Sequence, residues 1–172
     1  MSSTPSPPLV PALLFLIGLG ACWRLNPLGV PIQFDNQVYY YIAERAASGI
    51  PPHVSEFDPK NALSMLMTAA AIRIGRGVGV DDLLAARALS IAVTAAVLPL
   101  LWTATRRLGG NRWMAAVAVA VPLLFVDYLS LAVAGARPKV FLVFFEALWM
   151  LAAVAGRPIL LGVATGCCFL TW

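Results

Sequence analysis

Residues 34 to 60 read FDNQVYYYIAERAASGIPPHVSEFDPK and form the one long stretch of the chain that is too polar for the core of a lipid bilayer. The stretch holds four of the eight acidic residues, the only histidine and three of the four tyrosines. Charged side chains are costly inside a bilayer, so a stretch of this kind lies outside it. The apolar segments on either side are therefore expected to be organised around this loop.

The composition of the whole chain is typical of an integral membrane protein. Of its 172 residues, 60% are hydrophobic and 12% are charged, and the mean hydropathy is +0.84. Soluble domains carry about 25% charged residues. The net charge is +4, but the arginines are scattered at the edges of apolar runs, as headgroup anchors are. The expected partner is the lipid bilayer, and nucleic acid is not expected.

The cysteines and the histidine do not form a recognisable metal-binding motif. Cys22, Cys167 and Cys168 lie inside apolar segments, and two adjacent cysteines lack the spacing of metal ligands. Packing is therefore their expected role. With one histidine and no close carboxylate pair on one helix, the sequence predicts no self-contained metal site.

The apolar segments predict an all-α integral membrane protein, with residues 1–172 forming a single membrane domain. A span needs about 20 predominantly apolar residues. Five segments come near this length, and the expected spans are residues 9–25, 83–105, 113–133, 139–155 and 158–172. Residues 34–80 form the long loop between the first and second spans.

Two interfacial helices are expected within this loop. Asp35 can cap a helix that runs to about Ser48, with Gly49 as its left-handed stop. Val38, Tyr41, Ile42 and Arg45 recur in it at three- and four-residue spacing, while other polar residues face elsewhere, namely Tyr39, Tyr40, Glu44 and Ser48. This pattern favours a helix that lies on the membrane surface.

The second interfacial helix covers residues 61–72, which are apolar but too few to cross a bilayer. Three glycines, at positions 75, 77 and 79, are expected to loosen the chain after it. Asp81 or Asp82 can then cap the next helix.

The distribution of basic residues predicts the orientation of the spans. Arg106, Arg107, Arg112 and Arg157 fall in the short turns that share a side with the amino terminus. The positive-inside rule places that side in the cytoplasm and the long first loop outside.

Three charged residues lie inside the expected spans. Arg87, Asp127 and Glu146 each fall roughly 8 to 11 Å below the outer surface when the helical rise is counted. An isolated charge at that depth is unfavourable, so Arg87 is predicted to pair with Asp127 or Glu146 in the bundle interior. The alternative is that one or more of these side chains reach the interface instead.

The order of polar residues in the loop resembles a known family. The residues that carry the resemblance are Asp35, Tyr39-Tyr40, Gly49-Ile50-Pro51 and Phe57-Asp58-Pro59-Lys60, followed by Ala86-Arg87, by Arg106-Arg107-Leu108-Gly109-Gly110 and by the segment from Gly162 to Gly166. This pattern is similar to the amino-terminal part of GT-C superfamily glycosyltransferases, in the branch of bacterial lipid-A aminoarabinose transferases and protein O-mannosyltransferases. The resemblance implies a bacterial inner-membrane location.

The resemblance also implies roles for particular residues. Asp35 would take the proton from an acceptor hydroxyl as that hydroxyl attacks the anomeric carbon of a polyprenyl-phosphate sugar. Asp58 and Lys60 would lie near the lipid phosphate or a divalent cation, which would offset the charge of the leaving group. From the residues alone, Asp35 is equally a helix cap and Asp58 a turn residue before Pro59.

Further members of the implied substrate and lipid-phosphate group are Tyr39, Tyr40 and Arg137. At the next outer turn the aminoarabinose branch has an acidic residue, where this chain has the sequence Ala136-Arg137-Pro138-Lys139. One ligand for a metal or a substrate is therefore expected to be missing.

Two functions are consistent with these observations. The first is a membrane glycosyltransferase, or its amino-terminal portion, because the chain corresponds to only that part of the family enzymes. The second is a non-catalytic membrane subunit that packs against other membrane polypeptides in a larger complex, such as a bioenergetic or photosynthetic assembly.

Overall fold

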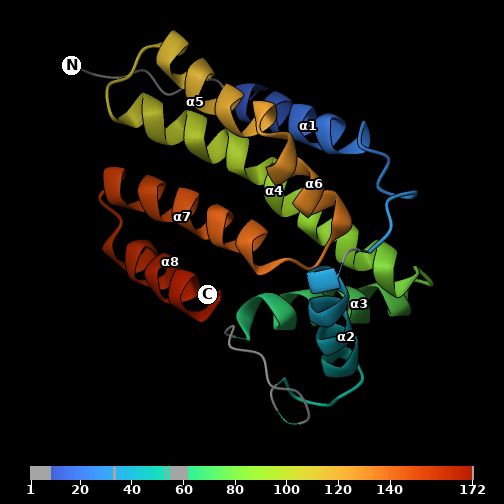
Figure 1. Cartoon of the computed structure of the whole chain (residues 1–172). Helices are drawn as coiled ribbons and strands as arrows, with labels where there is room; N and C mark the ends of the chain where they lie inside the picture. The colour runs from blue at the N-terminus through green and yellow to red at the C-terminus, as the bar shows by residue number, and fades with distance from the viewer. Residues whose placement is uncertain (1–8, 33, 53, 55–61, 172) are drawn as a thin grey trace.

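The computed structural model describes residues 9–32, 34–52, 54 and 62–171, and within this part the chain is entirely helical, with eight helices and no strand. The helices are α1 (Leu9–Trp23), α2 (Phe34–Ala47), α3 (Leu63–Gly77), α4 (Asp82–Arg107), α5 (Arg112–Leu124), α6 (Val126–Ala134), α7 (Pro138–Val154) and α8 (Pro158–Thr171). Six of them form a bundle, and α2 and α3 lie across one end of it (Figure 1). We call this the loop end and the opposite one the turn end.

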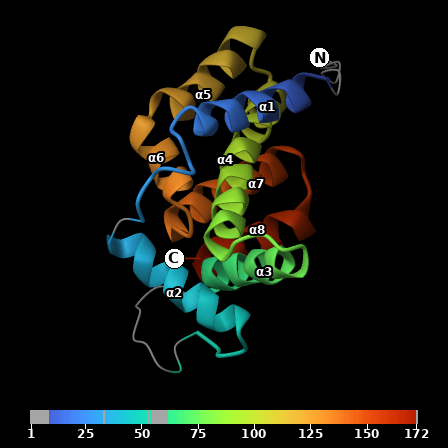
Figure 2. The same cartoon turned by 90° about the vertical axis from the view of Figure 1, so that its right-hand side faces the viewer.

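The central helix of the bundle is α4, which packs against α1, α3, α5, α6 and α7, while α8 packs on the outer side of α7 (Figures 1 and 2).

The sequence left two candidates for the N-cap of α4, Asp81 and Asp82. Asp81 is the cap, because its carboxylate accepts hydrogen bonds from the N–H groups of Leu83 and Leu84. Asp82 instead pairs with Arg76 of α3 at 2.6 Å, and this fixes α3 to the start of α4.

Among the described helices, only α4 is by itself long and apolar enough to cross a bilayer. The pair α5 and α6 meets the same test together, although the two are bent by 59° relative to each other. Two shorter apolar helices, α1 and α8, have 15 and 14 residues. The all-helical fold class is thus confirmed, whereas membrane insertion and the number of five spans stay predictions.

The segment expected as the span 113–133 is divided into two helices. The helix is interrupted at Phe125, whose backbone angles (φ −84°, ψ 83°) lie outside the helical region. Pro122 lies three residues earlier, but a proline disturbs the turn that precedes it, and α5 continues past Pro122 to Leu124. The structure offers no single residue as the cause of the break. The mean hydropathy of residues 113–133 does not reveal this break, because it depends on composition and not on backbone conformation.

The first interfacial helix has nearly the expected bounds, and Gly49 has the expected positive φ of 97°. One detail differs. The helix already begins at Phe34, so Asp35 lies in its first turn and is not its cap. Val38 and Tyr41 are exposed and Ile42 is buried, so the contact of this helix with a membrane surface stays a prediction.

The buried residues of α2 are Asn36, Ile42 and three alanines, at positions 43, 46 and 47, and the alanines pack in one cluster with Ala69 and Ile72 of α3. Small side chains allow two helices to approach closely, so the packed face of α2 is rich in alanine rather than in bulky apolar residues.

The glycines after residue 72 do not loosen the chain as expected, because α3 continues to Gly77. Gly75 is buried in the contact with α4, where an added Cβ would lie 2.7 Å from the Cβ of Ala85. Arg73 also donates to the backbone carbonyls of Ala46 and Ala47, at 3.0 and 2.8 Å, and so closes the carboxyl end of α2. These contacts hold α3 in a helical conformation well beyond Ile72.

Candidate functional site

The site at the loop end is built on the turn between α6 and α7. Gly135 and Ala136 both have positive φ, 82° and 55°, and the chain then enters α7 through Pro138. A Cβ on Gly135 would lie 3.0 Å from Cγ of Arg87, and the N–H of Ala136 donates to Ser90 Oγ at 3.1 Å. The turn is therefore fastened to α4, and this position directs Arg137 toward α2.

Arg137 and Asp35 form an ion pair, although they are 102 positions apart in the sequence. Nη2 of Arg137 lies 2.9 Å from Oδ2 of Asp35. The Arg137 side chain is 19% exposed, while that of Asp35 is 61% exposed. The guanidinium is thus held within the protein, and the carboxylate opens to the surroundings.

Asn36 completes this group, which we call the Asp35–Arg137 site. Nη1 of Arg137 lies 3.5 Å from Oδ1 of Asn36, at the long limit of a hydrogen bond. Asn36 is fully buried, and its amide nitrogen has no hydrogen-bond acceptor. An exposed ion pair contributes at most about 1 kcal/mol to stability. The pair therefore acts mainly by placing the two side chains relative to each other.

Arg87 stabilises the neighbouring loop in a way the sequence did not indicate. Its side chain is 4% exposed and donates to the backbone carbonyls of Pro27, at 2.6 Å, and of Val30. These bonds tie the loop between α1 and α2 to α4 and so fix where α2 begins. Loop carbonyls that have no helical N–H partner satisfy the guanidinium without a second charge.

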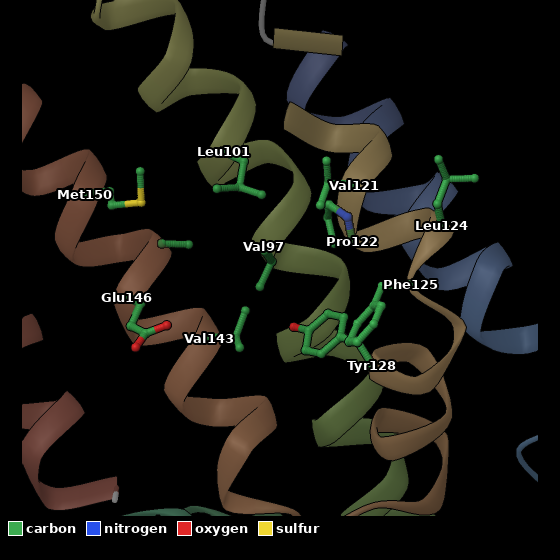
Figure 3. A pocket seen from close by; sticks show the side chains of 11 residues that line it. Val97, Leu101, Val121, Pro122, Leu124, Phe125, Tyr128, Val143, Glu146 and Met150 are labelled. Atoms are coloured by element: carbon green, nitrogen blue, oxygen red, sulfur yellow. The ribbon is translucent and has the colours of Figure 1, made fainter. Parts of the chain in front are cut away.

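The predicted pairing of Arg87 with Asp127 or Glu146 is therefore not what the structure shows. Among the ion pairs of the described residues, none joins these side chains. Asp127 lies exposed in the first turn of α6. Glu146 lies midway along α7 and lines a cavity of about 600 Å³ between α4, α7 and the α5–α6 pair (Figure 3).

The remaining predicted site residues lie elsewhere on α2 or outside the described part of the chain. Tyr39 and Tyr40 are half-buried on α2. Burial, and after it the nearby Glu44 carboxylate, raises the pKa of Tyr40 to about 12, so its phenol stays neutral at physiological pH. Asp58 and Lys60 lie outside the described residues.

The described residues contain no group of three or more His, Cys, Asp or Glu side chains that could hold a metal ion. The divalent cation implied by the family resemblance is therefore assigned no ligands here. The three cysteines are free, and Cys22 belongs to the buried core between α1, α4, α6 and α7.

Taken together, these observations define an all-helical protein whose loop end presents an exposed carboxylate beside a mostly buried guanidinium. Comparisons with known protein families, with curated proteins and with solved structures found no match. Any function must therefore be argued from the chemistry of the site and from the surfaces of the helices.

Proposed function

We propose that the chain is an integral membrane protein with five spans, namely α1, α4, the broken pair α5–α6, α7 and α8. The support is the apolar surface of the bundle. Large hydrophobic side chains are exposed on several of these helices, including Trp113 at 82%, Leu124 at 79% and Ile159 at 84%. Soluble proteins rarely expose large contiguous apolar areas. A lipid environment accounts for such a surface without a further partner.

The arrangement of the helices also supports an orientation. The turns that join α4 to α5 and α7 to α8 lie at the turn end, opposite α2 and α3 (Figure 1). These turns carry or adjoin Arg106, Arg107, Arg112 and Arg157. The proposal therefore places the turn end in the cytoplasm of a bacterial cell and the Asp35–Arg137 site at the outer face.

For the function of this face we propose glycosyl transfer from a polyprenyl-phosphate sugar, by a GT-C-like enzyme or its amino-terminal portion. The observation that carries the proposal is the Asp35–Arg137 ion pair. A phosphate is a natural partner for a guanidinium at the start of a helix, where the helix dipole also favours negative charge. A donor phosphate that engages Arg137 would release the Asp35 carboxylate for another partner.

The reaction assigns a separate task to each side chain. The acceptor hydroxyl oxygen attacks the anomeric carbon, and its proton passes to the Asp35 carboxylate. The bond between the anomeric carbon and the phosphate oxygen breaks, and the polyprenyl phosphate leaves with the electron pair. Arg137 stabilises the negative charge that develops on the leaving phosphate.

Transfer by the full chain in proteoliposomes tests this proposal. The donors are radiolabelled hexoses on polyprenyl phosphate, and the readout is label in an acceptor lipid or peptide. Asp35→Asn should lower the rate at least about 100-fold, because the amide cannot accept the proton. Asp127→Asn, which changes another exposed carboxylate, should leave the rate unchanged. Transfer at the normal rate by Asp35→Asn would reject Asp35 as the base.

A second function, that of a non-catalytic subunit, is favoured by one observation on α8. An added Cβ on Gly162 or Gly166 would meet no atom within 4 Å, so this small-residue face is not used inside the chain. Such faces allow close contact between membrane helices. If this function is correct, Gly162→Ile should release a partner polypeptide from the assembly in detergent while the helicity of the chain stays unchanged.

A further inference from the structure

The cavity that Glu146 lines has the features of a binding site within the membrane. Its volume is about 600 Å³, within the range of roughly 300 to 1,000 Å³ that is typical for small-molecule pockets. Its walls come from α4, α5, α6 and α7 and are apolar apart from the Glu146 carboxylate, since the hydroxyl of Tyr128 is buried. In Figure 3, Glu146 lies on one side of the cavity and the rings of Phe125 and Tyr128 lie on the other.

Glu146 is the first reason to assign a function to this cavity. It lies near the middle of α7, far from both ends of that helix, and its side chain is exposed. Within the described part of the chain it has no ion-pair partner, since Arg87 is engaged by the carbonyls of Pro27 and Val30. An ionisable group at such a depth in a membrane is costly unless a partner compensates its charge.

The break between α5 and α6 is the second, independent reason. Phe125, at the break, lines the same cavity as Glu146. Discontinuous helices near the middle of a membrane commonly form substrate or ion sites, because irregular backbone is tolerated there only where it lines a cavity. The break between α5 and α6 and the carboxylate of Glu146, which has no ion-pair partner among the described residues, thus line the same cavity.

The chemistry of the wall opposite Glu146 indicates what kind of molecule would bind. The rings of Phe125 and Tyr128 present aromatic surface, which attracts cations as well as apolar groups. The lining therefore combines one negative charge, aromatic faces and an otherwise apolar surface.

We propose that this cavity binds a lipid-soluble organic cation, with Glu146 as its counter-ion and the aromatic wall against its apolar body. The complementarity is one of charge and of polarity, since a single carboxylate in an apolar pocket matches a single positive charge on an apolar molecule. The inference rests on the proposed membrane topology but is independent of the proposed sugar transfer.

Binding of radiolabelled tetraphenylphosphonium to the full chain in phosphatidylcholine nanodiscs tests the site. Tetraphenylborate, which has the same shape and the opposite charge, is the matched ligand control. The wild type should bind the cation saturably above empty nanodiscs and should not bind the anion saturably. Glu146→Gln should weaken cation binding at least about tenfold, because the amide removes the charge.

Two further variants keep the test specific. Val121→Trp places a larger side chain in the lining of the cavity at a residue that is already exposed, so it should abolish binding without disturbing the core. Glu44→Gln makes the same chemical change on α2, away from the cavity, and should leave binding unchanged. Circular dichroism of each variant confirms that the helices are retained.

Several results would overturn the inference. These are cation binding by the wild type no greater than by empty nanodiscs, equal binding by Glu146→Gln, and saturable binding of tetraphenylborate. A chain that does not enter nanodiscs at all would overturn the membrane topology and this inference with it. Cation binding by a chain that transfers no sugar would reject only the proposed glycosyl transfer.

Discussion

Two arginines at the loop end are held by different kinds of partner, and the difference decides what each can do. Arg87 is buried and bonded to two backbone carbonyls, so its charge is committed to holding the loop between α1 and α2. Arg137 instead meets the carboxylate of Asp35, which is largely exposed. A ligand can compete for the second guanidinium but not for the first without opening the loop.

Replacement of Arg87 is therefore expected to lower the stability of the fold. Arg87→Met keeps most of the apolar stem but leaves the carbonyls of Pro27 and Val30 without their donors. A hydrogen bond to a charged group contributes about 1.5 to 3 kcal/mol, so the variant should lose on the order of 3 kcal/mol. The measurement is unfolding in mixed detergent micelles, followed by circular dichroism.

The control for this measurement is Arg107→Met at the turn end, where the arginine is exposed. Exposed substitutions usually change stability by less than about 0.5 kcal/mol. Equal unfolding curves for the Arg87 and Arg107 variants would show that the bonds of Arg87 to the loop carbonyls do not stabilise the fold.

At the level of whole helices, the close contact between α1 and α4 depends on Gly18, because a residue with a side chain would not fit there. A Cβ on Gly18 would lie 2.7 Å from Cα of Ala95, closer than real Cβ contacts come. Gly20, on the same helix, has no atom within 4 Å of its added Cβ. The two glycines therefore have different roles although they look alike in the sequence.

Substitution by alanine should separate these roles. Gly18→Ala is expected to destabilise the protein by about 1 to 3 kcal/mol, because α1 must move away from the backbone of α4. Gly20→Ala should have little effect or stabilise by up to about 1 kcal/mol, since alanine favours a helix. Thermal unfolding in one detergent compares them directly. A larger loss for Gly20→Ala than for Gly18→Ala would contradict the observed packing of α1 on α4.

At the scale of the whole molecule, the bundle has two chemically different ends. The loop end carries α2, α3 and the Asp35–Arg137 site, and the turn end carries four arginines at two short turns (Figure 1). The proposed function requires that these ends face opposite sides of a membrane.

Labelling of single cysteines tests this requirement in intact cells. In a chain whose three native cysteines are replaced by alanine, Ser48→Cys marks the loop end and Leu108→Cys the turn end. Both positions are exposed. A membrane-impermeant maleimide should label only the first in intact cells and both after permeabilisation. Labelling of both positions before permeabilisation would contradict the proposed topology.

The sequence by itself determined that the chain is helical and where most of the helices lie. Long apolar runs, the aspartates at 81 and 82 before α4 and Gly49 after α2 are local signals, because caps and stops act through neighbouring backbone groups. Which of the two aspartates is the cap was decided by the structure. The family resemblance pointed to Asp35 and Arg137, and the position of a charge within an apolar run pointed to Glu146. Local signals did not indicate the break at Phe125 or the alanine-rich face of α2.

Only the tertiary structure decided which of these candidates meet. Asp35 and Arg137 are joined across 102 positions, whereas Arg87 is bonded to loop carbonyls rather than to Asp127 or Glu146. Such contacts depend on how the helices approach one another, and that approach is set by small residues such as Gly18 and Gly135 against α4. The spacing of charges along a sequence fixes their depth in a bundle, but the packing of helices fixes their neighbours.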